Sequence, residues 1–386
     1  MTCRIVVFFG LFLLGLLSQG LAGEQDKAGQ LPPPQLGEYR QVRGPCSFEF
    51  PRDYGAHPGY RTEWWYYTGH LEATSGRAFG FQLTFFRIQI SPPGAETHWP
   101  EKPSAWRTQQ VFLAHAALSD LRAQRFHYDE QVSRGAVGLA GAGQNGGVTT
   151  VFLGSWSAVV NAEKHVLRVD TDLFRLDLTC RPLKSPVAHG DRGYSRKGSG
   201  REKASCYYSF TRLGVTGRLV LSGKPFAVEG TAWMDHEYGT APLEEELKGW
   251  DWFSLQLSDG TELMVYLLRL ESGGAHPASG GTYVSLSGGT QHLSKADVQV
   301  EIVNRWKSRR TGASYPSRWH VRVVPFDLDL ILSADLPDQE LITEKSTRVI
   351  YWEGHISAKG RKRGKPLTGT GYVELTGYAV DFDFLK

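Results

Sequence analysis

The chain has 386 residues, of which 41% are hydrophobic and 22% are charged, an ordinary balance for a globular protein of about two domains. Its formal net charge of +3 is too small to attract nucleic acid by bulk electrostatics, so no nucleic-acid partner is expected. The 44 glycines and an aromatic content of 12% favour strands and tight turns over helices.

The beginning of the chain has the pattern of a secretory signal. Arg4 precedes an apolar run from Ile5 to Leu17, and small residues at Gly20-Leu21-Ala22 predict cleavage after Ala22. The run is too short for a comfortable transmembrane span. We therefore expect a signal peptide over residues 1–22, a polar, proline-bearing leader over residues 23–45, and a secreted, periplasmic protein.

Three cysteines follow the predicted signal, at Cys46, Cys180 and Cys206. An oxidising compartment would allow them at most one disulfide. Two alternatives stay open: a bridge between Cys180 and Cys206, which flank one long basic loop, or three free, buried thiols. A domain of 150 to 200 residues can bury enough core without a bridge, so we expect a fold that does not depend on one.

Two stretches resemble copies of one strand. Gly223 to Thr240 and Gly364 to Tyr378 both read Gly-Lys-Pro, then Gly-Thr, then a small, an aromatic, an apolar and an acidic residue. The acid is Asp235 in the first copy and Glu374 in the second. Because an internal repeat decides the architecture, we expect two related halves, over residues 46–240 and 241–386.

The starts of the two halves also match. Trp65-Tyr66 and Trp252-Phe253 each lead through a turn into an apolar run that ends in an arginine, Arg87 or Arg269. Strand-like segments separated by turns about every 8 to 12 residues fill both halves, which is typical of sandwiches and barrels. These predicted strands are Arg61–Leu71, Phe79–Ile90, Arg107–Leu118, Val148–Ala158, Lys164–Asp170, Phe174–Cys180, Tyr207–Leu221, Trp250–Leu257, Thr261–Leu270, Val298–Val303, Arg318–Val324, Asp327–Ser333, Val349–Ser357 and Gly369–Tyr378. The predicted fold class is all-β, with two tandem lipocalin-like antiparallel β-barrels related by internal duplication.

Four motifs carry a family resemblance: Glu63-Trp64-Trp65-Tyr66, the loop Gly190 to Gly198, Tyr207-Tyr208-Ser209, and Trp233 to Glu237. Together they resemble the AttH/CrtC family over nearly all of the mature chain. The resemblance implies two tandem lipocalin-like domains and a large hydrophobic ligand. It implies several activities, since members include predicted secreted hydrolases, carotenoid 1,2-hydratases and fungal cyclases of polyenes. One departure is the wholly apolar strand Leu263 to Leu268, where the catalytic acid of the hydratases finds no match.

The end of the first half, at the seam between the halves, is the expected site. Hydrating an isolated double bond needs an acid, and aromatic faces would stabilise the cationic intermediate. Asp235 and Trp233 lie on the same face of one strand, and burial would keep the carboxyl protonated. His236 lies on the opposite face of a regular strand, so either Asp235 or His236 would line the cavity. Alternatively, these groups and Glu237 only hydrogen-bond the seam.

Glu63 is the third catalytic candidate. It faces the cavity or pairs with Arg87 on the neighbouring strand, because an unpaired buried carboxylate is costly. Strand alternation places Glu63 and Trp65 on one face and Trp64 and Tyr66 on the other. Aromatic side chains line the ligand cavity in this interpretation or pack the core in the alternative one; the candidates are Trp64, Trp65, Tyr66, Trp233, Trp250 and Trp252.

Other motifs do not point to a cofactor. Gly141 to Gly146 matches the dinucleotide pattern GxGxxG but opens no helix, and neither GxSxG nor HExxH occurs. Asp235, His236 and Glu237 cannot all face one ion from a regular strand, so we expect no metal and no cofactor. Basic clusters lie at Arg305–Arg310 and Lys359–Lys365. We expect the second, a glycine-bearing hairpin tip, to be a solvated turn or, alternatively, to contact an anionic membrane surface. The leading hypothesis is a hydratase-like enzyme acting on an isoprenoid, polyene or lipid-like molecule; the alternatives are a lipid carrier and a secreted hydrolase.

Overall fold

The computed structural model describes residues 37–379; the predicted signal peptide and most of the leader lie outside the described residues. No helix among these residues is long and apolar enough to cross a membrane. The described chain is built from strands and four short 3-10 helices, η1 (Arg52–Tyr54), η2 (Ala95–His98), η3 (Lys295–Asp297) and η4 (Val324–Phe326).

The first antiparallel sheet has 13 strands, in the order β4-β3-β2-β1-β13-β12-β9-β8-β7-β6-β5, with β10 and β11 also paired to β12. Its strands are β1 (Thr62–Ala73), β2 (Ala78–Gln89), β3 (Gln110–Asp120), β4 (Arg125–Arg134), β5 (Ala140–Asn145), β6 (Val148–Leu153), β7 (Trp156–Val160), β8 (His165–Asp170), β9 (Phe174–Pro182), β10 (Val187–Ala188), β11 (Tyr194–Arg196), β12 (Ala204–Leu221) and β13 (Lys224–Gly239).

The second antiparallel sheet has 10 strands, in the order β17-β16-β15-β14-β23-β22-β20-β19-β18, with β21 paired to β22. Its strands are β14 (Leu247–Leu257), β15 (Glu262–Leu270), β16 (Gly280–Val284), β17 (Thr290–Ser294), β18 (Val298–Lys307), β19 (Ser314–Val323), β20 (Leu328–Ala334), β21 (Glu340–Ile342), β22 (Ile350–Lys362) and β23 (Lys365–Leu375).

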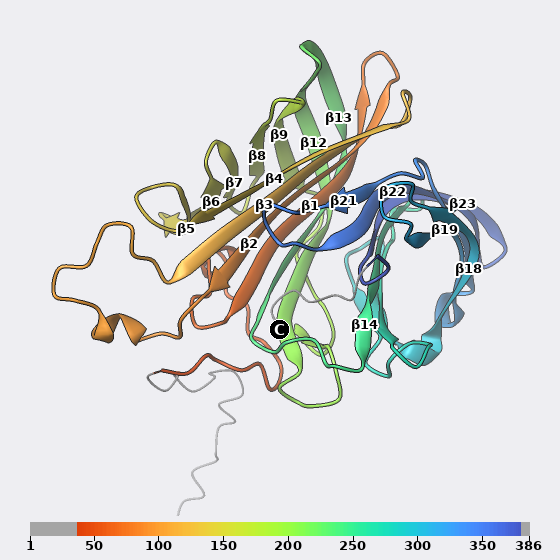
Figure 1. The fold of residues 1–386 in the computed structure, drawn as a ribbon. Helices are drawn as coiled ribbons and strands as arrows, with labels where there is room; N and C mark the ends of the chain where they lie inside the picture. Colours follow the sequence, from red (N-terminus) through yellow and green to blue (C-terminus); the bar gives the residue numbers. More distant parts are fainter. Residues whose placement is uncertain (1–36, 380–386) are drawn as a thin grey trace, which may run out of the picture. The chain divides into compact units, whose positions relative to one another are not determined.

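Both sheets follow one plan. In each, the first strand of the half pairs with its last strand, β1 with β13 and β14 with β23, and the remaining strands continue outward in sequence order on either side. Each sheet curls into a nearly closed barrel (Figure 1), and the second is easily followed as a ring from β14 to β23. The predicted all-β, duplicated two-barrel fold is confirmed.

The strand register refines the repeat. Tyr66 lies opposite Asp235, and Trp252 lies opposite Glu374. Because Asp235 and Glu374 occupy the same place in the two copies, Trp252 corresponds to Tyr66, and the predicted match of Trp65 with Trp252 is wrong by one residue. The slip matters because neighbouring residues of a strand point to opposite faces of the sheet.

Several strands lack a clear sequence signal. β5 lies in the glycine-rich segment that contains Gly141 to Gly146, and β10 and β11 lie in the long basic loop between Cys180 and Cys206. β4, β16, β17 and β21 were not predicted either. β4 and β17 lie at sheet edges, and both carry mostly polar residues. Such edge strands form by pairing with a neighbour, so their own hydrophobic pattern is weak.

The barrel interiors are packed with apolar side chains. Trp65, Tyr67, Phe85 and Met234 belong to the core of the first barrel, and a second core fills the other barrel around Trp319. The opposite faces of the same central strands form a third cluster, which joins side chains of both barrels, including Tyr66 and Trp252. The two barrels therefore pack through their outer faces.

One disulfide joins Cys46 to Cys206, and Cys180 is free and buried. Both alternatives drawn from the sequence, a Cys180–Cys206 bridge and three free thiols, are therefore wrong. The reason is register: Cys180 lies opposite Val215 on β12, nine residues beyond Cys206. At about 3.3 Å per residue, the two cysteines are roughly 30 Å apart along the strand. Cys46 comes from the segment before β1 and packs beside Cys206.

Candidate functional site

A cleft with a cavity of about 210 Å³ lies between the outer faces of the two barrels. Strands β1, β2, β12 and β13 form one wall, and β14, β15, β22 and β23 form the other. Its aromatic lining consists of Trp64, Tyr66, Tyr207, Trp250, Trp252 and Tyr266, together with Phe86 and Tyr351. Its carboxyl groups are Asp235, Glu237, Glu353 and Glu374.

Strand alternation explains which side chains reach the cleft. On β1 and β13, Trp64 lies opposite Glu237 and Tyr66 lies opposite Asp235, and all four side chains line the cleft. The residues between them point the other way, into the first barrel. Trp64 and Tyr66 of the sequence EWWYY, and Asp235 and Glu237 of the sequence WMDHE, therefore belong to the cleft.

Asp235 is buried in the wall of the first barrel, and three side chains donate hydrogen bonds to it. Tyr207 Oη donates to Oδ2 over 2.6 Å, while Trp233 Nε1, at 2.6 Å, and the Ser209 hydroxyl donate to Oδ1. Burial raises the pKa of the Asp235 carboxyl to about 7, although these three hydrogen bonds oppose the shift; the charge of Glu237 adds to it. The carboxyl is thus divided between its acid and base forms at neutral pH.

Glu353 and Glu374 form a second acidic pair, on the wall of the second barrel. They lie directly opposite each other on β22 and β23. Trp250 Nε1 donates to Glu374 Oε2 over 2.9 Å, and burial raises the pKa of Glu374 to about 7. Burial and then the charge of Glu374 raise the pKa of Glu353 well above its usual range, with Tyr66 opposing. Oε1 of Glu353 has no hydrogen-bond partner among residues 37–379.

Lys197 enters the cleft from the loop that follows β11. Its Nζ lies 2.8 Å from Glu237 Oε1, and the Ser205 hydroxyl donates to the same carboxylate. The ammonium group also lies over the rings of Tyr207 and Tyr266, at 5.2 and 5.1 Å from their centroids. The cleft therefore already holds one ammonium ion between a carboxylate and two aromatic faces.

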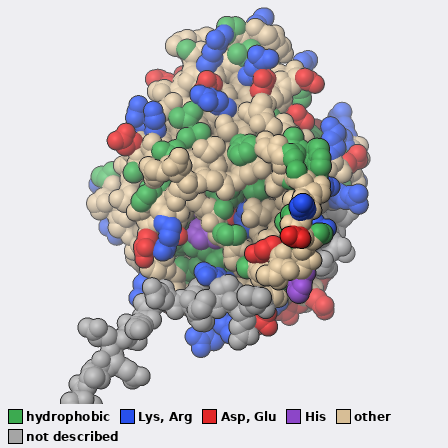
Figure 2. Space-filling model, turned by 90° about the vertical axis from the view of Figure 1, so that its left-hand side faces the viewer, with side chains coloured by type: hydrophobic (Ala, Val, Ile, Leu, Met, Phe, Trp, Pro, Cys, Tyr) green, Lys and Arg blue, Asp and Glu red, His purple; other side chains and the backbone are tan. Residues whose placement is uncertain are grey.

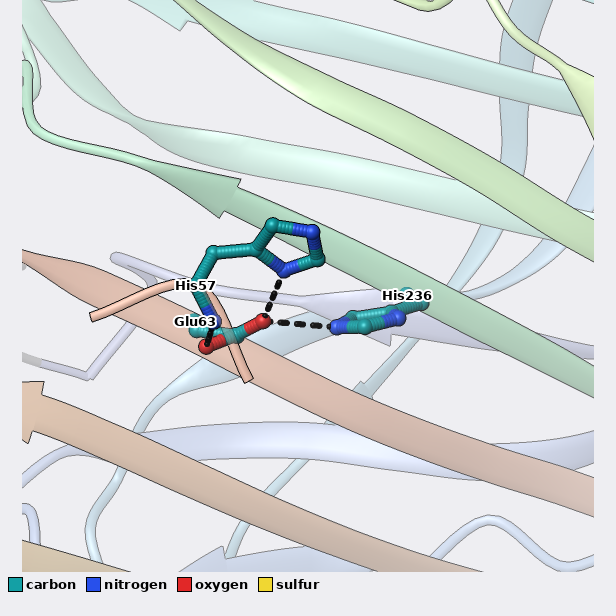
Figure 3. A group of neighbouring side chains, drawn as sticks. All are labelled: His57, Glu63 and His236. Atoms are coloured by element: carbon teal, nitrogen blue, oxygen red, sulfur yellow. Dashed lines mark hydrogen bonds and ion pairs between the residues drawn. The ribbon is translucent and has the colours of Figure 1, made fainter. Parts of the chain in front are cut away.

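Glu63, His236 and Trp65 lie on the barrel side of their strands, not in the cleft. His57 Nδ1 and His236 Nε2 approach the same Glu63 oxygen, Oε1, at 2.7 and 2.8 Å (Figure 3). Arg87 Nε donates to the other oxygen, Oε2, over 2.8 Å, which is the pairing that the sequence offered as the alternative role of Glu63. Glu63, His236 and Trp65 therefore belong to the interior of the first barrel, because successive side chains of a strand point to opposite faces of the sheet.

This buried group is electrostatically balanced. Burial raises the pKa of Glu63, but Arg87 and His57 outweigh it and hold that pKa well below its usual range. Burial lowers the pKa of His57, but Glu63 and Asp53 outweigh it and raise that pKa. Burial also lowers the pKa of His236, with Glu63 opposing. The Glu63 carboxylate is therefore compensated by the Arg87 guanidinium at one oxygen and contacts two imidazoles at the other.

Two groups of described residues could hold a metal ion. The ligand atoms of His57, Glu63 and His236 lie within 4.8 Å of one another, as do those of Glu244, Glu246 and His276. Two imidazoles and one carboxylate are the ligand types of many zinc sites. In the first group, however, each of these atoms already has a hydrogen-bond partner in the protein, and Arg87 supplies positive charge.

The remaining predicted residues all lie on the outward faces of their strands. Trp64, Tyr66, Trp250 and Trp252 line the cleft. Trp233 lies on the same outward face but borders a smaller neighbouring pocket, and its indole orients Asp235.

Four cleft residues, Glu353, Glu374, Lys197 and Tyr207, were not among the predicted site residues. The repeat did contain a signal for Glu374, because it aligned this acid with Asp235. Lys197 and Tyr207 lie within the family motifs.

The surface shows no single-sign patch on the face drawn in Figure 2. Basic and acidic side chains are interspersed there among apolar ones. This mixture fits the small net charge of the chain.

A family model and one solved structure identify the same family. A family model described as AttH-like matches residues 41–378. The crystal structure of a candidate AttH protein from Nitrosomonas europaea shares 32% sequence identity, with a TM-score of 0.77 over 88% of this chain and 99% of that chain. Kievitone hydratase from Nectria haematococca shares the fold at 16% identity, with a TM-score of 0.66 over 90% of this chain and 98% of that chain. The search of curated proteins found no match.

Proposed function

Because the chain belongs to the AttH-like family, we propose that the cleft between its barrels binds a molecule with a large apolar, unsaturated part and adds water to it by acid catalysis. The observation that carries this proposal is Asp235. It is a buried carboxyl in the wall of a cleft lined by eight aromatic residues, and burial raises its pKa to about 7. A general acid works best when its pKa lies near the operating pH.

The hydrogen bonds of Asp235 indicate how its proton reaches the cleft. A protonated Oδ2 can donate to the oxygen of Tyr207, because a hydroxyl accepts as well as donates. Tyr207 then turns its own proton toward the cleft and delivers it to one carbon of the double bond. Trp252 Nε1, which donates to the same hydroxyl over 3.1 Å, stays in place to orient it. The step leaves Asp235 ionised and Tyr207 neutral.

The positive charge then formed on the neighbouring carbon faces the aromatic rings of Trp64, Tyr66 and Trp252, which stabilise a cation through their faces. A water molecule forms the new carbon–oxygen bond and loses one proton. That proton returns through Tyr207 to the Asp235 carboxylate, so the enzyme ends in its starting state. The reaction consumes one water and one double bond and needs no oxidant or cofactor.

Export is part of the same proposal. The disulfide between Cys46 and Cys206 supports an oxidising compartment, where such bridges form and persist. The predicted signal over residues 1–22 and a hydrophobic ligand of the cell envelope are consistent with it. Isolating the protein from culture fractions and sequencing its N-terminus tests both the compartment and the cleavage after Ala22.

A non-catalytic carrier is the second candidate, and one observation favours it. Asp235 accepts three hydrogen bonds, which is how a purely structural buried acid is held. A secreted hydrolase is the third, since the same acid could protonate a leaving group.

Incubation of the protein with a native envelope extract in ¹⁸O-labelled water, followed by mass spectrometry, separates the three. Hydration adds one labelled water to an intact molecule, whereas hydrolysis gives two fragments, one of them labelled. A carrier retains an unlabelled ligand, and that result would refute the proposed hydration.

A further inference from the structure

The acids of the cleft outnumber its cations. Four carboxyl groups line it, at Asp235, Glu237, Glu353 and Glu374. Among the described lining residues, Lys197 alone carries a cationic side chain, and it is paired with Glu237. Asp235 is satisfied by three neutral donors. Glu353 and Glu374 therefore make no ion pair with any residue of 37–379, and Lys197 acts on Glu374 only through its charge.

Glu353 is the less satisfied of these two acids. Its side chain is 2% exposed, it lines the cleft, and its Oε1 has no hydrogen-bond partner among residues 37–379. A buried, unpartnered carboxyl oxygen is unfavourable unless something else occupies the site. The strand register places Glu374 directly opposite it, so both carboxyl groups face the same small volume.

Aromatic rings surround the pair. The ring of Tyr66 packs edge-on against Trp252, at 5.2 Å between centroids, and both line the cleft with Trp250. Lys197 shows what such surroundings bind in this protein, because its ammonium group lies between the Glu237 carboxylate and two tyrosine rings. The Glu353–Glu374 wall offers the same combination of carboxylate and ring without a lysine.

We propose that the wall of the cleft formed by Glu353, Glu374, Tyr66 and Trp252 binds an organic ammonium group carried on an apolar body. The carboxyl pair supplies the negative charge, and the ring faces supply the cation–π attraction. The proposal rests on the cleft being the ligand site, but it does not depend on the hydration chemistry. It names a feature of the ligand that neither the family nor the fold assigns.

Binding should be coupled to protons. The titratable groups that line the cleft with the Glu353–Glu374 pair are Asp235 and Glu237 on β13, Tyr66 on β1, His115 on β3, Tyr207 on β12, Tyr266 on β15, Tyr351 on β22 and Lys197. Burial keeps His115 neutral, with a pKa lowered to about 3, so the acids and Lys197 are the charged neighbours. Placing a cation beside the pair favours its ionised form, and protons leave as the ligand binds. The affinity for an ammonium ion should therefore rise with pH through the neutral range.

Calorimetry with 4-phenylbutylamine and the neutral 4-phenylbutanol tests this on the full mature chain. At about pH 8 we expect the amine to bind at least about tenfold more tightly than the alcohol. At about pH 5.5 this preference should shrink, because the cleft acids are then protonated while the amine stays charged. Titrations in buffers of different ionisation enthalpy should show proton release with the amine and none with the alcohol.

Glu353→Gln should abolish the preference and leave alcohol binding unchanged. Glu301→Gln, an exposed acid on β18, is the matched control and should behave as the wild type. Equal affinity of amine and alcohol for the wild-type protein at both pH values would overturn the proposal, whether or not Glu353→Gln folds. Asp235→Asn should keep the amine preference while it loses hydration, so failure of the cation site and failure of the proposed reaction are separate results.

Discussion

Asp235→Asn is the substitution that separates the chemical from the structural role of the cleft acid. The amide keeps an oxygen that can accept from Ser209 and from Trp233 Nε1. Its NH₂ group, however, faces the hydroxyl of Tyr207, which now donates to Asp235 over 2.6 Å and must turn round to accept. One imperfect buried hydrogen bond costs about 1–3 kcal/mol of folding stability.

The pH dependence of that cost has a definite sign. Burial raises the pKa of Asp235 from 3.8 to about 7, so the folded state binds more protons than the unfolded state between these values. The wild type therefore has its full stability below about pH 4 and loses part of it as the pH rises to about 7. At roughly 1.4 kcal/mol for each unit, the loss is on the order of 4 kcal/mol. The variant should not lose stability in this way, because asparagine at this position carries no ionisable group.

Thermal unfolding of both proteins at about pH 4 and about pH 8.5 measures this difference. At the lower pH, the variant should unfold at a lower temperature than the wild type. At the higher pH, the gap should close or reverse, since only the wild type then carries a buried charge. Turnover of the hydrated substrate should fall roughly 100- to 10,000-fold in the variant, because the proton donor is lost. Asp172→Asn, in an exposed turn, is the control and should change neither quantity.

Two results would refute the reasoning separately. A stability gap that stays the same at both pH values would show that Asp235 is ionised throughout, and its raised pKa would then be wrong. A variant with full turnover per folded molecule would show that Asp235 is no acid catalyst, and the carrier would become the better hypothesis.

Three further predictions test other parts of the structure. Tyr207→Phe should lower turnover with little change in ligand affinity, because it removes the relay from Asp235; unchanged turnover, measured with labelled water, would exclude the relay. Glu63→Gln should cost about 3–5 kcal/mol in denaturant titrations near neutral pH, because the buried Arg87 loses its only carboxylate partner among the described residues. The cost should shrink below about pH 4.5, where the stabilising ionisation of Glu63 is lost in the wild type. Adding a reductant, or making Cys206→Ser, should lower the free energy of unfolding by about 2–5 kcal/mol, since the disulfide closes a loop of 160 residues. Identical thermal melting with and without reductant would instead confirm the expectation from the sequence that the fold does not depend on a disulfide.

The sequence predicts the fold well because its signals are local and repeated. Alternation along Glu63 to Tyr67 assigns each side chain to a face, and the structure has the same assignment. The Gly-Lys-Pro repeat predicts the duplication, and the pairing of first and last strands in each sheet agrees with it. Both features can be recognised in a single sequence, because side-chain alternation has a period of two residues and the repeat compares two stretches of the same chain.

The sequence does not reveal which face of β1 becomes the cleft. Both faces carry aromatic residues, and both are buried, one in the first barrel and one against the second. Hydrophobic alternation distinguishes a buried face from a solvated one, so it gives no answer where both are covered. For the same reason Trp65 and Tyr66 were equally good candidates for the ligand site. The partner of Cys206 was missed because Cys46 lies before the first strand, in a segment without a periodic pattern.

The duplication itself explains why this site can be acidic. Asp235 and Glu374 occupy corresponding positions, and each accepts a hydrogen bond from an indole, of Trp233 and Trp250 respectively. On the outer face of a single barrel, such an acid would be hydrated and ionised at neutral pH. Packing two copies through these faces removes the water, raises both pKa values to about 7 and brings the acids to one cavity. The chemistry therefore depends on the contact between the barrels. A substitution that loosens this contact should lower the pKa of Asp235 and leave less of it protonated at neutral pH, even where no cleft residue is changed.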